Sequence, residues 1–231
     1  MSSVDNTWRR WEAISTWRRV IDCLPHLDGD SREVDPFPLS ECTHVIFTKD
    51  CFDMLGAEGN YGRLAHWISE SEIGVFCLDG VNLATPALRG RFWDKVAECP
   101  YIQCIAIANT TIADDDEHYY AMQSIITTTN LKMLSFVDCD IQSADIGVVI
   151  QWREREDEDL HCEGRLRYLA FEDCRFDNWQ PDDLIAFARN IGEAKLCSVS
   201  FVGCHLSENE SFLFQGVIRC KCAETVVIVN R

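Results

Sequence analysis

Cysteine and histidine have the widest chemical range in this chain, and their spacing decides which chemistry is open to them. The 231 residues include 13 cysteines and 6 histidines. Structural zinc sites and thiol oxidoreductases place two cysteines two residues apart, and no C-x-x-C pair occurs. His161-Cys162 and Cys220-Lys221-Cys222 lack the spacing of a structural zinc site. We therefore predict no metal and no cofactor.

The one candidate nucleophile pair is His44 and Cys77, which a repeat in the chain places on neighbouring predicted strands. A cysteine nucleophile also needs a group that orients its base, and Asp79 is the one acid nearby. Neither a G-x-S-x-G turn nor a phosphate-binding glycine loop is present. We predict that the chain is not an enzyme. A cysteine-dependent enzyme stays as an alternative, which the thiol pKa of Cys77 would distinguish.

Several cysteines recur at one position of a repeat. Segments that begin at Leu131, Leu166 and Leu196 align without gaps on the pattern L-x-x-L-x-L-x-x-C-x-L, where L is a large apolar residue. The same frame starts at residues 42, 73 and 102, and an incomplete copy starts at 223. In the six complete copies every frame position except Asp50 and Thr110 is apolar or cysteine, although only 47% of the chain is apolar. The copies begin 27 to 35 residues apart, which indicates a repeat architecture.

This period and pattern resemble leucine-rich repeats, and the cysteine at the ninth position is similar to the ribonuclease-inhibitor-like and cysteine-containing subtypes. The resemblance implies an α/β solenoid, with a curved parallel β-sheet on the concave side and helices on the convex side. The alternation within each copy independently favours a strand. We expect about seven repeats over residues 42–231, and we expect Cys139, Cys174 and Cys204 to point inward, toward backbone groups of the adjacent coil.

Helix-start signals follow several predicted strands. Thr85-Pro86 places a capping residue before a first-turn proline. A second helix is expected to start at Gln180-Pro181-Asp182-Asp183. Residues 114–117 are all acidic, which favours a helix start, and Ser207 opens a capping box. We therefore expect the order strand, turn, helix to repeat along the chain.

Residues 1–41 are expected to form an N-terminal capping helix and a connection, because a solenoid needs its ends covered. Large apolar residues recur every three or four positions over residues 7–24. They are Trp8, Trp11, Ile14, Trp17, Ile21 and Leu24. A partner-binding or membrane-surface helix and a mitochondrial presequence are alternatives, the last weakened by the acids Asp5, Glu12 and Asp22. Trp8 and Trp11 are secondary candidates for partner contact.

The third, fifth and seventh positions of each copy are expected to face the concave surface. Only Asp79 and Glu172 among them carry a formal charge, although the chain has a net charge of −17. A small, neutral and partly apolar hollow is typical of an interaction site. The alternatives are that a segment of this same chain, or water, fills it. The predicted protein-binding residues are His44, Ile46, Cys77, Asp79, Ala106, Met133, Ser135, Tyr168, Ala170, Glu172, Ser198 and Ser200.

The last predicted strand, at residues 226–229, would present a bare apolar edge. Val227 and Val229 are therefore secondary contact candidates in a homodimer or hetero-complex, unless the strand is simply short and protected. The charged run at residues 153–159 is either a solvated helix end or a loop for a basic partner. We leave both alternatives open.

Composition limits the class of partner. A net charge of −17 repels phosphate backbones, so direct nucleic-acid binding is not expected. No stretch is apolar enough to span a bilayer, and the N-terminus lacks the pattern of a secretory signal. We expect a cytoplasmic or nuclear adaptor or complex subunit, with a mitochondrial location as the alternative. Two other roles stay open: an enzyme inhibitor or regulator of the ribonuclease-inhibitor type, and a substrate-receptor subunit of a ubiquitin ligase.

Overall fold

The computed structural model places most of the repeat region. It describes residues 44–49, 65–66, 68–85, 88, 91–126, 130–150, 166–194, 196–204 and 225–229. Several sequence predictions lie outside this part of the chain: the capping helix with Trp8 and Trp11, the acidic run at 153–159, and the helix start at Ser207.

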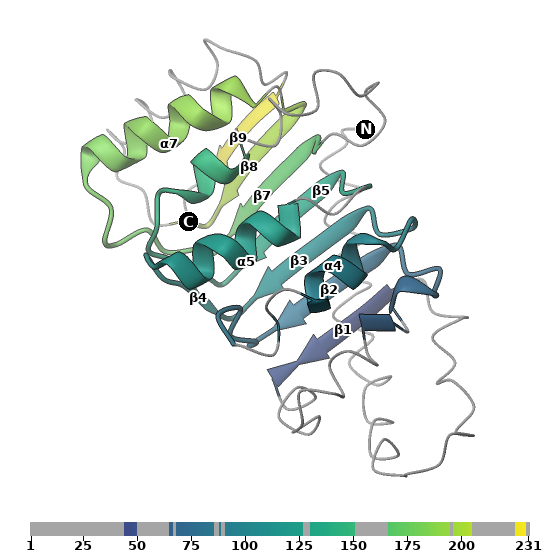
Figure 1. Ribbon diagram of the computed structural model, residues 1–231. Helices are drawn as coiled ribbons and strands as arrows, with labels where there is room; N and C mark the ends of the chain where they lie inside the picture. Colours follow the sequence, from purple (N-terminus) through teal and green to yellow (C-terminus); the bar gives the residue numbers. More distant parts are fainter. Residues whose placement is uncertain are drawn as a thin grey trace.

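The fold is mixed α/β with a parallel sheet, which confirms that part of the predicted fold class (Figure 1). The sheet order is β1-β2-β3-β5-β7-β8-β9, and every neighbouring pair is parallel. The strands are β1 (His44–Thr48), β2 (Val75–Asp79), β3 (Cys104–Ala108), β5 (Met133–Val137), β7 (Tyr168–Glu172), β8 (Ser198–Val202) and β9 (Thr225–Val229). A second, two-stranded sheet pairs β4 (Thr111–Ile112) with β6 (Asp140–Ile141). Neighbours in the main sheet are therefore successive in the chain apart from these short strands.

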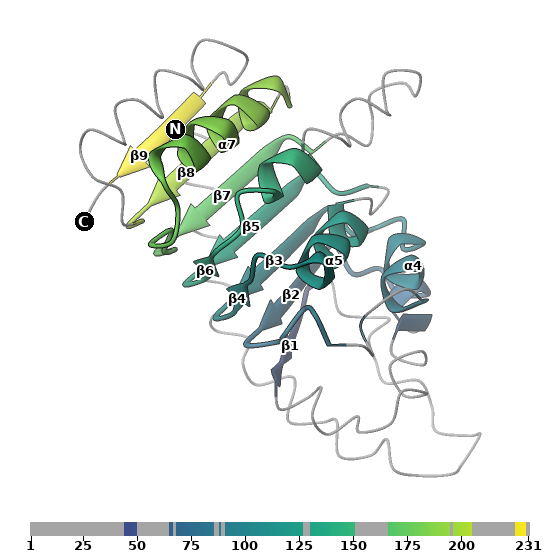
Figure 2. The same cartoon turned by 60° about the vertical axis from the view of Figure 1, so that its left-hand side comes forward.

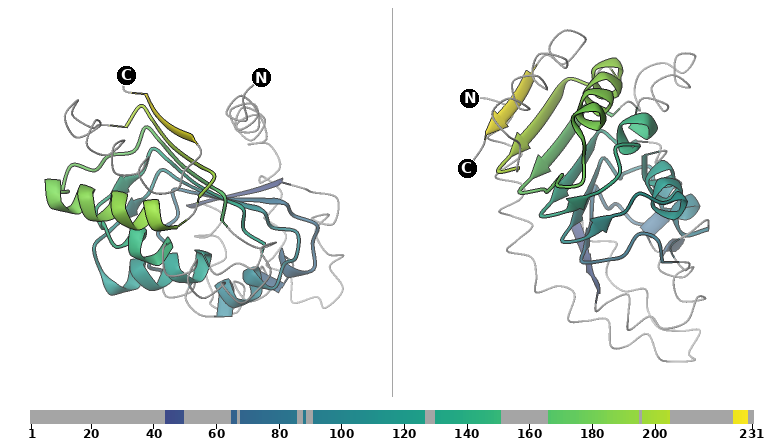
Figure 3. Two further views of the ribbon diagram at one scale, coloured as in Figure 1. Left: turned by 90° about the horizontal axis from the view of Figure 1, so that it is seen from above. Right: turned by 90° about the vertical axis from the view of Figure 1, so that its left-hand side faces the viewer.

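The helices whose bounds the structure gives share one side of the main sheet. They are α4 (Arg91–Ala97), α5 (Asp116–Ile126) and α7 (Pro181–Glu193). Views from three directions place all three on the same face (Figures 2 and 3). The second and fourth residues of β1, β2, β3, β5, β7 and β8 point to this face and join one core with the helices, as Leu134, Phe136 and Phe187 do. Burying a leucine or phenylalanine side chain contributes about 1.5–3 kcal/mol each, so the alternation in the sequence explains why helices cover this face.

The helix starts follow the capping chemistry expected from the sequence. Asp115 precedes α5, and its Oδ1 accepts the backbone N–H of His118 at 2.8 Å. That hydrogen bond, with a second from the His118 ring, lowers the pKa of Asp115. Before α7, the backbone N–H of Gln180 donates to the Asp183 carboxylate at 2.9 Å. The predicted α7 start is thus confirmed, and the helix expected after Thr85-Pro86 corresponds to α4, described from Arg91.

A column of phenylalanine rings crosses the core. Phe136 and Phe171 stack with ring centroids 5.0 Å apart, and Phe171 and Phe201 stack at 4.9 Å. These separations match the spacing of about 4.8 Å between neighbouring strands. Phe171 also meets Phe176 and Phe187 edge to face. It is therefore the ring that joins three repeats and α7.

Replacing Phe171 with alanine is expected to lower the free energy of unfolding by about 3–5 kcal/mol, because it opens a cavity between two stacked rings. Urea unfolding followed by circular dichroism measures this. Ala186→Ser, at an exposed position of α7, is the control and should change stability by less than about 0.5 kcal/mol. A loss below about 1 kcal/mol in Phe171→Ala would contradict the role of the column.

Five strands of the main sheet, β2, β3, β5, β7 and β8, are each followed by a turn residue with positive φ. Asn109, Asp138 and Asp173 have φ near 50°, and Gly80 and Gly203 have φ near 69°. Glycine, asparagine and aspartate tolerate this left-handed conformation best. The turn N–H donates to the carbonyl at the end of the next strand, for example from Asp138 to Glu172 at 2.8 Å. The predicted repeat pattern did not include this turn position. Its residue types, glycine, asparagine and aspartate, were the signal in the sequence that could have revealed it.

A β-branched residue at Asp138 should strain this turn. We expect Asp138→Val to lower stability by about 1–3 kcal/mol and Asp138→Gly to have little effect. Thermal unfolding of the two variants against the wild type measures the difference. Equal stability of valine and glycine at this position would show that the turn does not require positive φ.

The repeat cysteines point inward, as predicted. Cys139, Cys174 and Cys204 are buried. The Cys139 thiol donates to the carbonyl of Ile107 at 3.4 Å, and the Cys204 thiol lies 3.6 Å from the carbonyl oxygen of Phe171, each in the preceding repeat. Hydrogen bonding to Cys139 and Cys204, together with burial, raises the pKa of the Cys174 thiol. Thr110 occupies the position that cysteine has in other repeats, and its hydroxyl donates to the carbonyl of Val81 at 3.0 Å.

Candidate functional site

The predicted binding residues on the strands lie in three rows across the main sheet, at the first, third and fifth positions of each strand. In the middle row each residue pairs with the next, in the order Ile46, Cys77, Ala106, Ser135, Ala170, Ser200 and Val227. Strand residues two apart point to the same face, and the residues between them join the helix-side core. We call the face formed by these three rows the helix-distal face. Val229, Asp79 and Glu172 lie in its last row, and His44, Met133, Tyr168 and Ser198 in its first.

Exposure varies along the helix-distal face. The exposed fraction is small over the first four strands: 8% for Ile46, 3% for Cys77, 0% for Ala106 and 1% for Ser135. The first three of these residues form a small buried cluster, and Val75 packs against it. Tyr168 is 39% exposed. The remaining predicted residues with described side chains are half-buried: Asp79, Met133, Ala170, Glu172, Ser198 and Ser200. The accessible part of the face therefore lies over β7 and β8 and the edge of β5.

Ser135 is an unusual member of the middle row. Its side chain is 1% exposed, and its Oγ has no hydrogen-bond partner. A buried hydroxyl without a hydrogen-bond partner lowers the free energy of unfolding by about 1–3 kcal/mol. Ala106 and Ala170 are its partners on the neighbouring strands and offer no polar group. The middle row therefore contains a buried hydroxyl without a hydrogen-bond partner, between two alanines.

The carboxyl end of the sheet is acidic. Asp79 and Glu172 end β2 and β7, and Asp138 and Asp173 occupy the turns after β5 and β7. Asn109 holds one of these acids, because its Nδ2 donates to Asp79 Oδ1 at 2.6 Å. The described cations nearest in sequence are Lys49, directly after β1, and Arg175, beyond the β7 turn. A partner that reaches this edge meets mainly negative charge, beside a neutral middle row.

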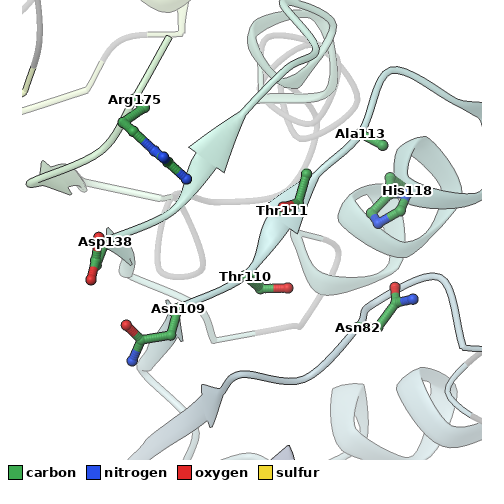
Figure 4. A pocket seen from close by; sticks show the side chains of 8 residues that line it. All are labelled: Asn82, Asn109, Thr110, Thr111, Ala113, His118, Asp138 and Arg175. Carbon is green, nitrogen blue, oxygen red and sulfur yellow. The ribbon is translucent and has the colours of Figure 1, made fainter. Parts of the chain in front are cut away.

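A polar pocket of about 620 Å³ lies beside these turns and the start of α5 (Figure 4). Its lining side chains are Asn82, Asn109, Thr110, Thr111, Ala113, His118, Asp138 and Arg175. Three of them already serve the fold: Thr110 and Asn109 in the bonds given above, and His118, whose Nδ1 lies 2.8 Å from Asp115 Oδ1. The sequence predictions did not include this pocket, because its residues come from the segments that follow four different strands, β2, β3, β5 and β7.

Cys77 does not have the properties of a nucleophile. Burial, reinforced by the charge of Asp79, raises the pKa of its thiol to about 12. Reactive cysteines have a lowered pKa instead. In the register of the sheet Cys77 pairs with Ile46, whereas His44 pairs with Val75, so the two candidate residues are not directly opposite.

Within the ranges that the structure describes, no group of three or more histidine, cysteine and acidic side chains could hold a metal ion. The same part of the chain has no helix that is both long and apolar enough to cross a bilayer. No protein-family model, curated protein or solved structure matches the chain.

Cys77 should therefore react slowly with alkylating reagents. With a pKa of about 12, about one thiol in 10⁴ is ionised at pH 8, against roughly a quarter for an ordinary cysteine. We expect iodoacetamide to modify Cys77 more slowly than the half-buried Cys197, and the rate to rise as the pH approaches 12. Alkylation of the folded chain followed by peptide mass spectrometry measures both sites. Rapid modification of Cys77 near neutral pH would indicate an activated thiol and would contradict a purely structural role.

Proposed function

We propose that the chain is a leucine-rich-repeat protein whose strands line the concave wall of a curved solenoid, with the helices on the convex side. One strand per repeat, paired in the order of the sequence and at the same repeat position, supports this architecture. The inward cysteines and the left-handed turns after β2, β3, β5, β7 and β8 support the ribonuclease-inhibitor-like or cysteine-containing subtype.

Within that architecture, we infer that the chain is a non-enzymatic protein-interaction module, an adaptor or a subunit of a larger complex. The observation that carries this proposal is the middle row of the helix-distal face, which contains no charged residue. Small side chains let the backbone of a partner approach closely, and strands held in one sheet lose little conformational entropy on binding. The raised pKa of Cys77 argues against thiol catalysis at the same face.

The accessible part of the face is where a partner would first make contact. Tyr168 offers an aromatic ring with a polar hydroxyl, a type of side chain that is frequent in binding hot spots. Ala170 and Ser200 lie beside it on β7 and β8 and leave room for a partner side chain. Glu172 at the end of β7 favours a basic group on the partner at that edge.

The test is the capture of complexes by the tagged full-length chain from its native cells, with mass spectrometry of the captured proteins. We expect Ala170→Arg to reduce the yield of specific partners by about tenfold or more, because a long cation then occupies the middle row. Ala186→Arg places the same substitution on the exposed side of α7 and should leave capture unchanged. Ser200→Arg is a second face variant, and circular dichroism confirms that each variant is folded. Unchanged capture by both face variants would exclude the helix-distal face as the binding surface.

A further inference from the structure

The polar pocket beside the start of α5 lies along one position of the repeat. Asn82, Thr111 and Arg175 line it, and each stands two residues after the left-handed turn residue of its own repeat. Thr111 pairs with Asp140 in the two-stranded sheet, and Asp140 forms a bridge to Arg175. Residues at this position therefore follow one another at about one strand spacing, roughly 4.8 Å, and form a polar row along the pocket.

The pocket has one arginine and one acid, and both lie at the same end of it. Figure 4 shows Arg175 and Asp138 together on the side opposite His118. Within the described part of the chain, neither Arg175 nor Asp138 forms an ion pair or a side-chain hydrogen bond, with each other or with a third residue. The guanidinium and the carboxylate therefore both keep their hydrogen-bonding groups for a ligand.

The other end of the pocket offers uncharged hydrogen-bonding groups. Asn82 Oδ1 accepts the backbone N–H of Ala84 at 2.9 Å, which leaves the Asn82 Nδ2 as a donor. His118 Nδ1 donates to the Asp115 carboxylate, because a carboxylate can only accept, so Nε2 of the neutral ring is an acceptor. The exposed Thr111 hydroxyl lies between the two ends and can both donate and accept.

We propose that this pocket binds a free α-amino acid that has a polar side chain. The Arg175 guanidinium holds the carboxylate through two parallel N–H donors, the geometry that arginine favours. The Asp138 carboxylate accepts hydrogen bonds from the ammonium group. Both charged groups of an amino acid sit on one carbon atom, as Arg175 and Asp138 sit at one end of the pocket. The ligand side chain then extends toward Thr111, Asn82 and His118.

The charges of the pocket favour this class of ligand over simpler ions. A ligand with only a carboxylate or a phosphate brings its negative charge close to Asp138, and a ligand with only an amine brings its positive charge close to Arg175. A zwitterion leaves neither side chain unpaired in the complex. Inside a peptide the same two groups are uncharged amides, so the charges also favour the free amino acid over a segment of a protein.

The pocket has a suitable size and lining. Its volume of about 620 Å³ lies within the range of about 300–1,000 Å³ that is common for small-molecule sites. The row from Asn82 to Arg175 covers three strand spacings, about 14 Å, which leaves room for a side chain beyond the charged end. Ala113 is the one lining residue without a polar side chain. An apolar ligand side chain therefore gains little in this pocket.

Thermal unfolding of the full-length chain in the presence of each standard amino acid tests the proposal. We expect a polar amino acid to raise the unfolding temperature by about 5 °C or more near saturation, because a ligand that binds only the folded state stabilises it. Calorimetric titration then measures its dissociation constant and stoichiometry. The absence of a shift with every amino acid would overturn the proposal, and so would shifts confined to apolar ones.

Two variants remove one charge each without disturbing the turns. Arg175→Gln removes the cation, and Asp138→Asn removes the acid at a turn position where Asn109 already has a φ of 51°. We expect each to weaken binding by about tenfold or more, because hydrogen bonds to charged groups are strong. The controls Arg167→Gln and Asp173→Asn make the same changes outside the pocket and should bind as the wild type does. Wild-type affinity in either pocket variant would contradict a zwitterionic ligand.

Analogues of the amino acid that binds best identify the groups that are recognised. The carboxylic acid without the amine and the amino acid amide each lack one charge, and both should bind about tenfold or more weakly. A peptide that contains the same residue between an acetylated and an amidated end should not bind. Equal binding of this peptide would indicate a protein segment as the ligand and would overturn the proposal.

The pocket and the helix-distal face are separate surfaces. None of the residues that line the pocket belongs to a strand of the main sheet. The amino acid titration uses no protein partner, and the capture experiment on Ala170→Arg uses no small ligand. Failure of one proposal therefore leaves the other standing, and the two sets of variants distinguish them.

Discussion

The parallel register of the main sheet is the constraint on which the other features depend. Each strand pairs with the next at the same repeat position, so residues of equal position form rows across the molecule. A shift of one residue in any strand would move Phe136 or Phe171 from the core to the opposite face and bring Ser135 or Ala170 inside. The stacked rings of Phe136, Phe171 and Phe201 resist such a shift, because their separation equals the strand spacing.

The same register organises the ends of the strands from β2 to β8 in the main sheet. A left-handed residue follows each of these strands, and its N–H can bond to the neighbouring strand, as from Asn109 to Val137 and from Asp173 to Val202. The next side chain then turns inward to meet a carbonyl, as a thiol in Cys139 and as a hydroxyl in Thr110. These turns place acids along one edge of the sheet, and that edge borders the proposed binding surface.

The helix-distal face has two parts with different accessibility and one kind of chemistry. Its middle row is buried over β1, β2, β3 and β5, and it is half-open over β7 and β8, where Tyr168 is exposed. Small neutral side chains suit contact with a segment of the same chain or with another protein, because the same packing and desolvation stabilise both.

The strands, their order, their register and the inward cysteines could be predicted from the repeat pattern alone. Each repeat has the same period-two alternation, and alternation decides locally which side chains can be buried against a helix layer. The helix starts at Asp115 and Gln180 could also be predicted, because a capping residue bonds to the first turn of its own helix and needs no distant contact. The left-handed turn was readable in principle, from the shared glycine, asparagine and aspartate. Tertiary structure alone decided exposure within a row: Ala106 and Ala170 hold the same repeat position, yet one is fully buried and the other half-open. It also decided the unpartnered state of Ser135 and the polar pocket beside α5. The physical reason is that exposure depends on what packs against a face from elsewhere in the chain, and a repeat pattern contains only the contacts between one coil and the next.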